Sequence, residues 1–564
     1  MNSRKVTEMY LAQPVIARSD KLPQPKRFCL RFLRSAVLRA KSQDRSRHDI
    51  GPARHEFRKH SHVTPWLPLI ALAMVIGRSS AQQLSVPRVD AMPDRPAPYV
   101  MRDWKQVARG YDSLVYDIGH TGQYLPLVFW NNSPKNYPTQ RSYGLHTVVG
   151  TTVPDNSEAI NVLPSLIGAT LAGIDKKDQN GNDWVLMSQN FFNIKSEELV
   201  YLNNEVTNSG DDWWYDTMPN VFFYQLCWLY PGHGDSERQF SSVADRWLQA
   251  VRSMGGVTTP WHIPNMDHRG WRLLSMTPND EQPHEPESAG AIAWLLYNAW
   301  LRTGDIKYRS GAELSLEFLN AYPSNPSYEL QLSYGAYIAA RMNAELGTTY
   351  DVPKIVNWCF DRGPIRSWGA VIGKWGGLDC SGLIGEINGS NDYAFLMNTL
   401  EQVGALVPLV RYDDRFACAI GKWVLNAANA ARLFYPNFLP DQNQDSEDWS
   451  HIYDPDGYIG HEALRQRQTG GTASPYATGD AISGGWGQTN LALYGSSHVG
   501  ILAGIVDTTN VPGILRLDLL KTDYFHDSAY ASYLFSTRIR PFTQFTLMPG
   551  PGSMTSMMRS RMLS

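Results

Sequence analysis

The stretch Ala289–Tyr308, A-G-A-I-A-W-L-L-Y-N-A-W-L-R-T-G-D-I-K-Y, decides the fold class of this chain. Its first twelve residues include one strongly polar side chain, Asn298, so a helix formed there needs cover on nearly every side. The turn that follows ends this helix, Asp305 can cap the next one, and Tyr308 opens the buried face of that second helix. A short turn between two long helices predicts an antiparallel helical hairpin.

The same arrangement recurs elsewhere in the chain. Tyr230–Phe240 and Val410–Phe416 also join two apolar helical patterns through a short polar turn that contains aspartate. Helical spacing of apolar residues predicts about a dozen helices. They are expected at 101–116, 157–174, 188–194, 212–230, 236–254, 286–302, 308–320, 328–346, 352–359, 392–410, 415–434 and 491–506. Two concentric rings of six helices, with the most apolar helices inside, would bury these faces.

These features resemble the six-hairpin glycosidases. The resemblance rests on the G-D-x-K-Y type of turn at Gly304–Tyr308, the number of helices, the tryptophan-rich loops and a secretory leader. It covers residues 101–507 and implies an (α/α)6 toroid with a sugar cleft at one end. The same toroid hosts inverting glycoside hydrolases, unsaturated-uronide hydrolases and polysaccharide lyases, so the fold alone leaves the reaction open.

The first 81 residues are expected to be separate from this catalytic domain. Residues 54–81 combine a basic segment, the apolar run Val63–Gly77 and small residues before Gln82, which is the pattern of a secretory signal peptide. The apolar run is short for a membrane span, and an uncleaved anchor is the alternative. Residues 1–53 fit no signal peptide, and we expect an extension from a start codon assigned too far upstream. Residues 82–100 are rich in proline and are interpreted as a linker.

The helical pattern ends near Asp507. Gly513–Leu520 and Ala529–Phe535 alternate like strands, so a C-terminal β-domain is expected to start within 508–535. Residues 536–564 are rich in arginine, methionine and serine without alternation, and are expected to form a poorly ordered or aberrant tail. The predicted fold class is therefore mainly α, an (α/α)6 toroid followed by a short, incomplete β-domain.

Charge and motifs narrow the function. Met1–Ala81 carries 16 Lys and Arg against 5 Asp and Glu, so the remainder of a chain of net charge −3 is acidic, which argues against nucleic acid as a partner. The isolated cysteines form no C-x-x-C pair, and a calcium-like stretch at 441–452 has Ser446 and Ile452 where glycine and glutamate are required. No metal, no cofactor and no stable membrane insertion are predicted.

The catalytic candidates are carboxylic acids in glycine-rich loops and at helix starts. Glycosidases use two carboxyl groups, about 5–5.5 Å apart for retention and about 6.5–9.5 Å apart for inversion. Trp375–Asn398, W-G-G-L-D-C-S-G-L-I-G-E-I-N-G-S-N-D-Y-A-F-L-M-N, provides Asp379 and Glu386, and its glycines permit close approach of a ligand. Glu287 in H-E-P-E precedes the most apolar helix, and Asp480 lies in a second glycine-rich stretch. Turn formation, capping and helix-dipole roles are the alternatives.

Substrate contacts are predicted where aromatic rings lie beside charged residues, because the apolar face of a sugar stacks on indole. The predicted substrate-binding residues are Asp212, Trp213, Trp214, His268, Arg269, Trp375 and Trp486. An N-cap role is the alternative for Asp212, and a structural role is the alternative for the histidine.

The sequence therefore favours a secreted or periplasmic glycoside hydrolase that cleaves a poly- or oligosaccharide with paired carboxylates. One alternative is a polysaccharide lyase, which would need a tyrosine or histidine base and a cationic or amide group beside the uronate. Another is a catalytically inactive sugar-binding protein. The abundance of acids over cations in the glycine-rich loops favours hydrolysis.

Overall fold

The computed structural model describes residues 82–154, 156–389, 392–444, 448–467, 476–478, 485–526, 531–536 and 543–547. The chain divides into two units, Met1–Ser80 and Ala81–Ser564, and the fold described below belongs to the second. The expected extension and signal peptide lie outside the described residues. In the part of the chain that is described, none of the helices combines the length and apolarity needed to span a bilayer.

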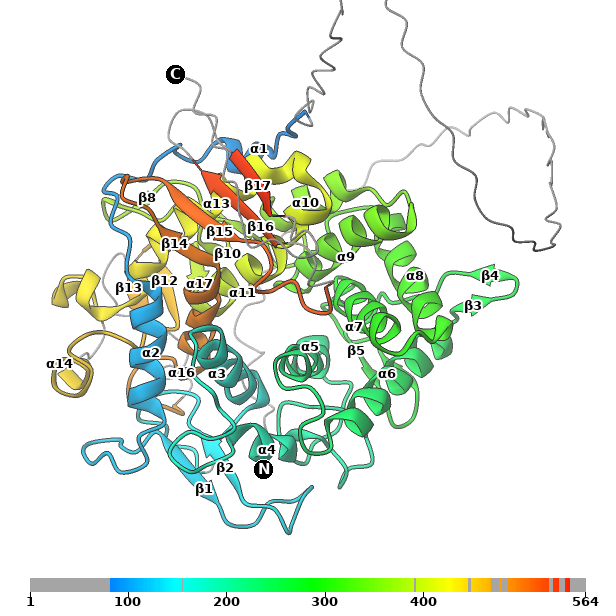
Figure 1. Ribbon diagram of the computed structural model, residues 1–564, viewed down its shortest axis with the longest axis horizontal. Coiled ribbons are helices and arrows are strands. Elements are labelled where there is room, and N and C mark those ends of the chain that lie inside the picture. Colours follow the sequence, from blue (N-terminus) through cyan, green and yellow to red (C-terminus); the bar gives the residue numbers. More distant parts are fainter. Residues whose placement is uncertain are drawn as a thin grey trace, which may run out of the picture. The chain divides into compact units, whose positions relative to one another are not determined.

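Six helices close a ring. They are α3 (Ala159–Leu171), α5 (Trp213–Leu229), α7 (Ser288–Thr303), α9 (Gln331–Leu346), α11 (Leu396–Leu406) and α17 (Gly500–Ile505). Each packs against the next in chain order, and α17 packs back against α3. Figure 1 shows this closure, with the orange α17 beside the blue α2 and the teal α3. Every residue of α7 from Ser288 to Ala299 is buried, as the apolar pattern of that stretch predicts.

A second set of helices alternates with the ring along the chain. It comprises α2 (Trp104–Val115), α4 (Trp184–Ser188), α6 (Ser236–Ser253), α8 (Ile306–Ala321), α10 (Val352–Phe360) and α13 (Ala417–Ala430). Each of these helices packs against at least one ring helix. Between α7 and α8, Gly304 adopts a left-handed conformation (φ 72°) and the Asp305 side chain accepts the Lys307 N–H at 3.0 Å. The helical hairpins and the (α/α)6 toroid predicted from this turn are thus confirmed.

Short helical turns complete the helical part. They are α1 (Pro87–Asp90), η1 (Gln189–Phe191), α12 (Leu409–Tyr412), η2 (Asp414–Phe416), η3 (Ala431–Phe434), η4 (Pro436–Phe438), η5 (Asp441–Asn443), α14 (Asp448–Tyr453), α16 (Leu493–Ser496) and η6 (Ser497–Val499). Residues 82–100, expected to be a linker, instead pack on α10 and α13 through α1, where Val86 and Val89 are fully buried.

Small antiparallel sheets lie near the starts of the ring helices. One has the strand order β13-β12-β11-β10-β7, formed by β7 (Trp368–Ala370), β10 (Ile384–Glu386), β11 (Tyr393–Phe395), β12 (Ala463–Arg465) and β13 (Tyr476–Thr478). The hairpins are β1 (Val128–Asn131) with β2 (Ser142–Leu145), β3 (Val257–Thr258) with β4 (Trp261–His262), β5 (Gly270–Arg272) with β6 (Thr277–Asn279), and β8 (Lys374–Trp375) with β9 (Leu378–Asp379). The glycine-rich stretch 375–398 is therefore a series of strands, and β11 runs directly into α11.

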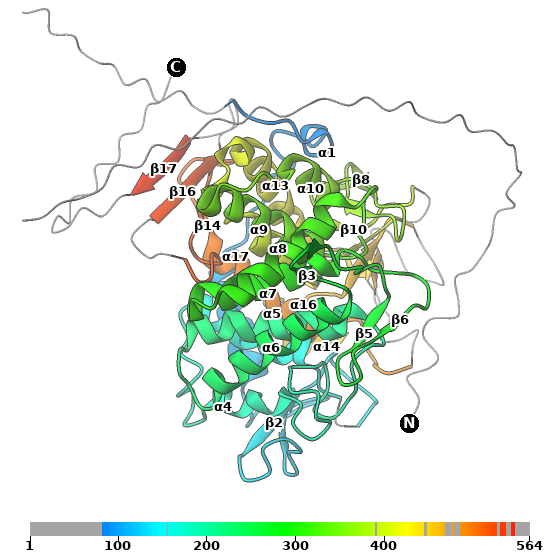
Figure 2. The same cartoon turned by 90° about the vertical axis from the view of Figure 1, so that its right-hand side faces the viewer.

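A four-stranded sheet lies beside α17. It consists of β14 (Val506–Thr508), β15 (Leu515–Asp518), β16 (Ala531–Ser536) and β17 (Thr543–Leu547), in that order and antiparallel. In Figure 2, β14 and β16 lie on the left of the ring helices, whereas β5, β6 and β10 lie on the right. The strands expected within 513–520 and 529–535 are present, but β17 lies in a tail for which no strand was expected.

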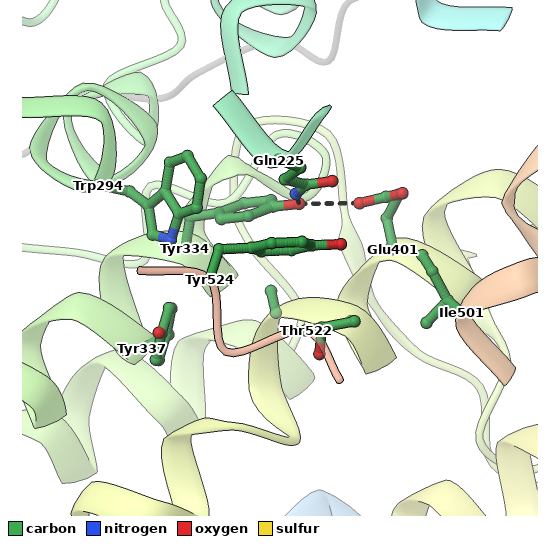
Figure 3. A pocket seen from close by; sticks show the side chains of 10 residues that line it. Gln225, Trp294, Tyr334, Tyr337, Glu401, Ile501, Thr522 and Tyr524 are labelled. Carbon is green, nitrogen blue, oxygen red and sulfur yellow. Dashed lines mark hydrogen bonds between the residues drawn. The ribbon is translucent and has the colours of Figure 1, made fainter. Parts of the chain in front are cut away.

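The segment that follows β15 enters the ring. Asp523 is fully buried and pairs with Arg341 of α9 and Arg411 of α12. The Tyr524 ring lies 6.4 Å from that of Trp294, in an edge-on arrangement. Figure 3 shows the aromatic rings that line a small space at this point. Its volume is about 10 Å³, which is roughly the room for one water molecule. Side chains thus fill this part of the ring interior.

Candidate active site

Carboxyl groups gather where successive ring helices begin. Glu158 and Asp212 are the N-cap residues of α3 and α5, Glu287 is the N-cap of α7, and Glu329 lies two residues before α9. Helix starts favour negative charge, because their N–H groups are unpaired and the helix dipole is positive there. The ring brings these starts together from distant parts of the sequence, at the end where β10 carries Glu386.

Asp212 is held in place by its own helix and by Arg269. Its Oδ1 accepts the Trp214 N–H at 2.9 Å, and its Oδ2 lies 3.1 Å from Nη2 of Arg269. Burial raises the pKa of Asp212, and the Arg269 charge counteracts part of that rise. The Asp212 side chain nevertheless remains 16% exposed, so a ligand can contact it.

Glu285 lies beside Arg269, as Asp212 does, but is more deeply buried. Its side chain is fully buried, and Nη1 of Arg269 is 4.0 Å from its Oε1, beyond hydrogen-bonding distance. Burial raises the pKa of Glu285 well above its usual range, and the neighbouring Asp212 charge raises it further. Glu285 is thus a carboxylic acid held out of solvent beside an accessible one.

Arg366 joins two other carboxylates. Its Nε donates to Oε1 of Glu386 at 2.7 Å and its Nη1 pairs with Oε1 of Glu329. Burial raises the pKa of Glu329, although the Arg366 charge opposes that effect. Burial lowers the pKa of Arg366, but the two carboxylates outweigh it and the pKa ends well above its usual range. The guanidinium therefore fixes the separation of Glu329 and Glu386.

Glu287 differs from these acids because it is fully buried and bonded to backbone. Its Oε1 accepts the Glu329 N–H at 2.8 Å, which ties the start of α7 to the segment preceding α9. Burial raises the pKa of Glu287 to about 7 despite hydrogen bonds from neighbouring backbone N–H groups. Its placement fits support of the helix starts, and a role in chemistry stays a prediction.

Tyr215 is the exposed aromatic side chain beside these acids. It is 44% exposed, yet desolvation by the surrounding protein raises its pKa well above the usual range, and Glu158, Asp212 and Glu329 are among its electrostatic neighbours. The exposed part of the Tyr215 side chain is accessible to a ligand. Tyr215 can therefore present its face to a sugar ring between the carboxylates.

The predicted tryptophan platforms are not available to a ligand. Trp213, Trp214 and Trp375 are 0%, 4% and 3% exposed, and Nε1 of Trp213 donates to the His268 carbonyl at 2.9 Å. Trp213 and Trp214 are core residues because a ring helix is covered on nearly all sides, which holds for α5 as well as for α7. Trp375 is buried in strand β8. The burial of all three does not favour a role as stacking surfaces, which stays a prediction.

Four of the other predicted residues join the acid cluster, whereas His268 makes a contact within its own loop. Asp212, Arg269 and Glu386 join the acid cluster, together with the buried Glu287. His268 is mostly buried and its Nδ1 pairs with Asp280 at 2.5 Å, a contact that orients the loop before β5.

The glycine-rich stretches contribute less to the cluster than expected. Asp379 is buried in the β8–β9 hairpin, where its carboxylate accepts the Ser381 N–H at 3.1 Å in a local turn. Trp486 is half-buried against the core, and Asp480 lies outside the described residues. The predictions for Asp379 and Trp486 as functional residues stay untested.

Sequence reasoning did not identify Glu329, Arg366 or Tyr215. A search of every expected helix start for acids would have found Glu329, which lies at the beginning of the pattern 328–346. Arg366 sits in a turn between α10 and β7 and has no periodic pattern to mark it.

Within the described residues, no group of three or more His, Cys, Asp or Glu side chains is placed to hold a metal ion.

Comparisons with known proteins identify no family. No protein-family model and no curated protein matches the sequence. Among solved structures, the unsaturated glucuronyl hydrolase of Streptococcus agalactiae is similar over 75% of this chain and 94% of its own, with 12% identity and a TM-score of 0.37. One mutant of that enzyme is 13% identical, with 75% of this chain and 92% of its own chain covered and a TM-score of 0.36. A second mutant is 12% identical, with 76% of this chain and 94% of its own chain covered and a TM-score of 0.37. Values this low say nothing about the reaction of this chain, so the functional case rests on its own residues.

Proposed function

We propose that this protein is a glycoside hydrolase in which Asp212 donates a proton to the leaving oxygen and Glu386 activates water. The observation that carries the proposal is that two accessible carboxyl groups stand in different electrostatic settings around one site. Asp212 has a raised pKa, whereas Glu386 receives a hydrogen bond from the Arg366 guanidinium at 2.7 Å. Such a division between a proton donor and an ionised carboxylate is what glycoside hydrolysis requires.

Arg366 relates the two groups to each other. It contacts Glu386 directly and is an electrostatic neighbour of Asp212, so both carboxyl groups lie around the same cation. Glu329 sits on the other side of that guanidinium, where Nδ2 of Asn398 lies 3.5 Å from its Oε2. We assign Glu329 to positioning of Arg366 and to contact with substrate hydroxyls.

The charge of the site favours a substrate region without carboxylates. Glu158 and Glu329 are electrostatic neighbours of Tyr215, while Arg269 and Arg366 are both engaged with protein acids. A neutral sugar can stack on Tyr215 and donate its hydroxyl protons to these acids.

A lyase is supported less well by the same residues. It would need a cation to neutralise a uronate carboxylate and a tyrosine or histidine that readily gives up its proton. Both arginines already pair with acids, and burial raises the pKa of Tyr328 well above its usual range. We keep the lyase and the inactive sugar-binding protein as outcomes of the test.

The test is incubation of the chain from Gln82 onward with neutral oligosaccharides, uronate polysaccharides and unsaturated uronides. Reducing ends and near-ultraviolet absorbance are recorded together. Hydrolysis within a chain raises reducing ends alone, a lyase raises both, and release of an unsaturated uronide lowers the absorbance. Binding by calorimetry without turnover would identify a sugar-binding protein and contradict our proposal.

Substitution then assigns the roles. Asp212→Asn and Glu386→Gln should each lower kcat by about 10² to 10⁴, the usual contribution of a general acid or base. Glu313→Gln on α8, which removes a carboxylate paired with Arg309 away from the ring interior, is the matched control. Wild-type activity in Asp212→Asn would remove Asp212 from the mechanism.

We also propose that the enzyme is exported, with cleavage before Gln82. The support is the basic, apolar and small-residue order of residues 54–81. Expression of the full chain with N-terminal sequencing of the exported product tests it, and an intact N-terminus on the exported product would contradict it.

A further inference from the structure

Glu285 is a buried acid whose carboxylate oxygens meet no hydrogen-bond donor in the part of the chain that the structure describes. Its backbone N–H donates to the His268 carbonyl at 2.9 Å, so the chain is fixed at this point. Its side chain is fully buried, and among the described residues neither Oε1 nor Oε2 meets a hydrogen-bonding partner of the ordinary kind. A charged carboxylate in such a place would cost several kcal/mol if it stayed unpaired.

The group that faces Glu285 is another carboxyl. Asp212 and Glu285 flank the same guanidinium, because Nη2 of Arg269 lies 3.1 Å from Oδ2 of Asp212 and Nη1 lies 4.0 Å from Oε1 of Glu285. Two carboxylates cannot donate to each other, whereas a carboxylic acid and a carboxylate can share one proton in a strong hydrogen bond. A shared proton satisfies an oxygen of Glu285 that no other described group satisfies.

We propose that Glu285 and Asp212 hold one proton between them, and that Glu285 acts as a positioning residue that keeps Asp212 a proton donor at neutral pH. This rests on the proposed function of Asp212. In the reaction the bond from the sugar carbon to the glycosidic oxygen breaks, and the shared proton moves to that oxygen. Water adds to the carbon and gives its proton to Glu386. Glu386 then releases that proton to solvent, and solvent returns one proton to the pair.

The surroundings oppose loss of that proton. Burial raises the pKa of both members of the pair. The charged or titratable groups around the pair include Tyr215 and Asp216 of α5, His268 and Arg269 before β5, Glu287 before α7, Tyr328 and Glu329 before α9, and Arg366 after α10. The nearby Glu287 and Glu329 charges add to the repulsion in a doubly ionised pair, and Arg269 pairs directly with Asp212. The pair therefore titrates as a unit with a high second step.

The pH profile of kcat/KM tests the proposal, because its alkaline limb reports ionisation of the proton donor. In Glu285→Gln, Asp212 titrates alone beside Arg269, so the limb should move to lower pH by about one unit or more, while kcat at acidic pH stays near wild type. A purely structural role would lower activity or stability at every pH without moving the limb. Glu285→Met, which removes both unsatisfied oxygens, should move the limb in the same way.

Asp454→Asn is the matched control. Asp454 is also buried with a pKa raised to about 7 by burial, but it accepts hydrogen bonds from the Tyr458 and Ile459 backbone in a turn near α2. Its loss should leave the alkaline limb in place. An unmoved limb in both Glu285 variants would overturn the proposal.

An infrared measurement separates this proposal from the hydrolase assignment, because it needs no substrate. The difference spectrum of wild type minus Glu285→Gln at neutral pH should contain a protonated carboxyl band. If this band is present and the protein is inactive on every glycan, the proposed function is contradicted and the shared proton is supported. Its absence would refute the shared proton whatever the activity.

Discussion

Nε of Arg366 donates to Oε1 of Glu386 at 2.7 Å, and this bond ties the turn after α10 to strand β10. The same guanidinium pairs with Glu329 at the start of α9. One side chain thus sets the positions of two carboxylates that are 57 residues apart in the sequence. We call these two contacts of Arg366 the arginine bridge, and we expect it to position both carboxylates.

Arg366→Lys should lower kcat by about tenfold to a hundredfold with a smaller effect on stability. A lysine retains the charge but cannot span two carboxylates with a planar fork, and a misplacement of about 1 Å is enough for such a loss. Steady-state kinetics on the active glycan measures the effect. Arg309→Lys, at an Arg–Glu pair within α8, is the control and should behave as wild type. Wild-type kcat in Arg366→Lys would show that the arginine bridge does not position the catalytic groups.

Tyr215→Ala should raise KM by about tenfold and leave kcat nearly unchanged, because loss of a stacking ring removes on the order of 1 kcal/mol of binding. Tyr215→Phe keeps the ring and should remain close to wild type. Calorimetric titration with a substrate fragment gives the same comparison without turnover. Equal affinity in Tyr215→Ala would remove the ring from the binding surface.

Trp213→Ala should act on folding instead, since its indole is fully buried in the ring. Truncation of a buried tryptophan costs about 3–5 kcal/mol, which chemical denaturation can measure. Unchanged stability combined with weakened sugar binding would restore Trp213 as a platform.

Glu287 should make the protein less stable as pH rises from about 4.5 to about 7. Its pKa is near 4.5 when unfolded and is raised by burial to about 7 when folded, so the folded state binds more protons in this window. The stability linked to its protonation is complete below this window and lost above it, on the order of 3 kcal/mol. Glu287→Gln keeps an oxygen for the Glu329 N–H and removes this titration.

The measurement is the difference in unfolding free energy between Glu287→Gln and wild type at pH 5 and pH 8. The unfolding free energy of Glu287→Gln relative to wild type should be higher at pH 8 than at pH 5. Other buried acids such as Asp454 titrate in both proteins and cancel in the comparison. A difference that is the same at both pH values would mean that Glu287 is ionised in the fold.

Removal of residues 1–81 should leave the unfolding temperature unchanged, whereas removal of residues 1–92 should lower it. Val86 and Val89 are fully buried, and the Gln83 side chain accepts the Cys418 N–H at 2.8 Å at the start of α13. Burial of two valines contributes on the order of 3–6 kcal/mol. Differential scanning calorimetry of the two truncated chains gives the answer, and equal unfolding temperatures would show that α1 adds nothing.

Local patterns in the sequence determined the helical hairpins. The apolar run from Ala289 and the cap at Asp305 depend on residues three or four positions apart, and such neighbours meet in a helix whatever the rest of the chain does. The alternation within 513–520 predicted β15 for the same reason. The solvent exposure of a side chain does not follow from such local patterns. Trp213 was therefore predicted to stack on a sugar, although its helix is buried on nearly every side.

Tertiary structure decided which acids form the site. Asp212, Glu285, Glu329 and Glu386 come from different hairpins and meet because the ring closes and aligns the helix starts. Their pKa values follow from desolvation by side chains far away in the sequence, and that quantity exists only after packing. The sequence by itself determined the hairpins, whereas the closed ring determined which carboxyl group is buried, which is accessible and which cation each one meets.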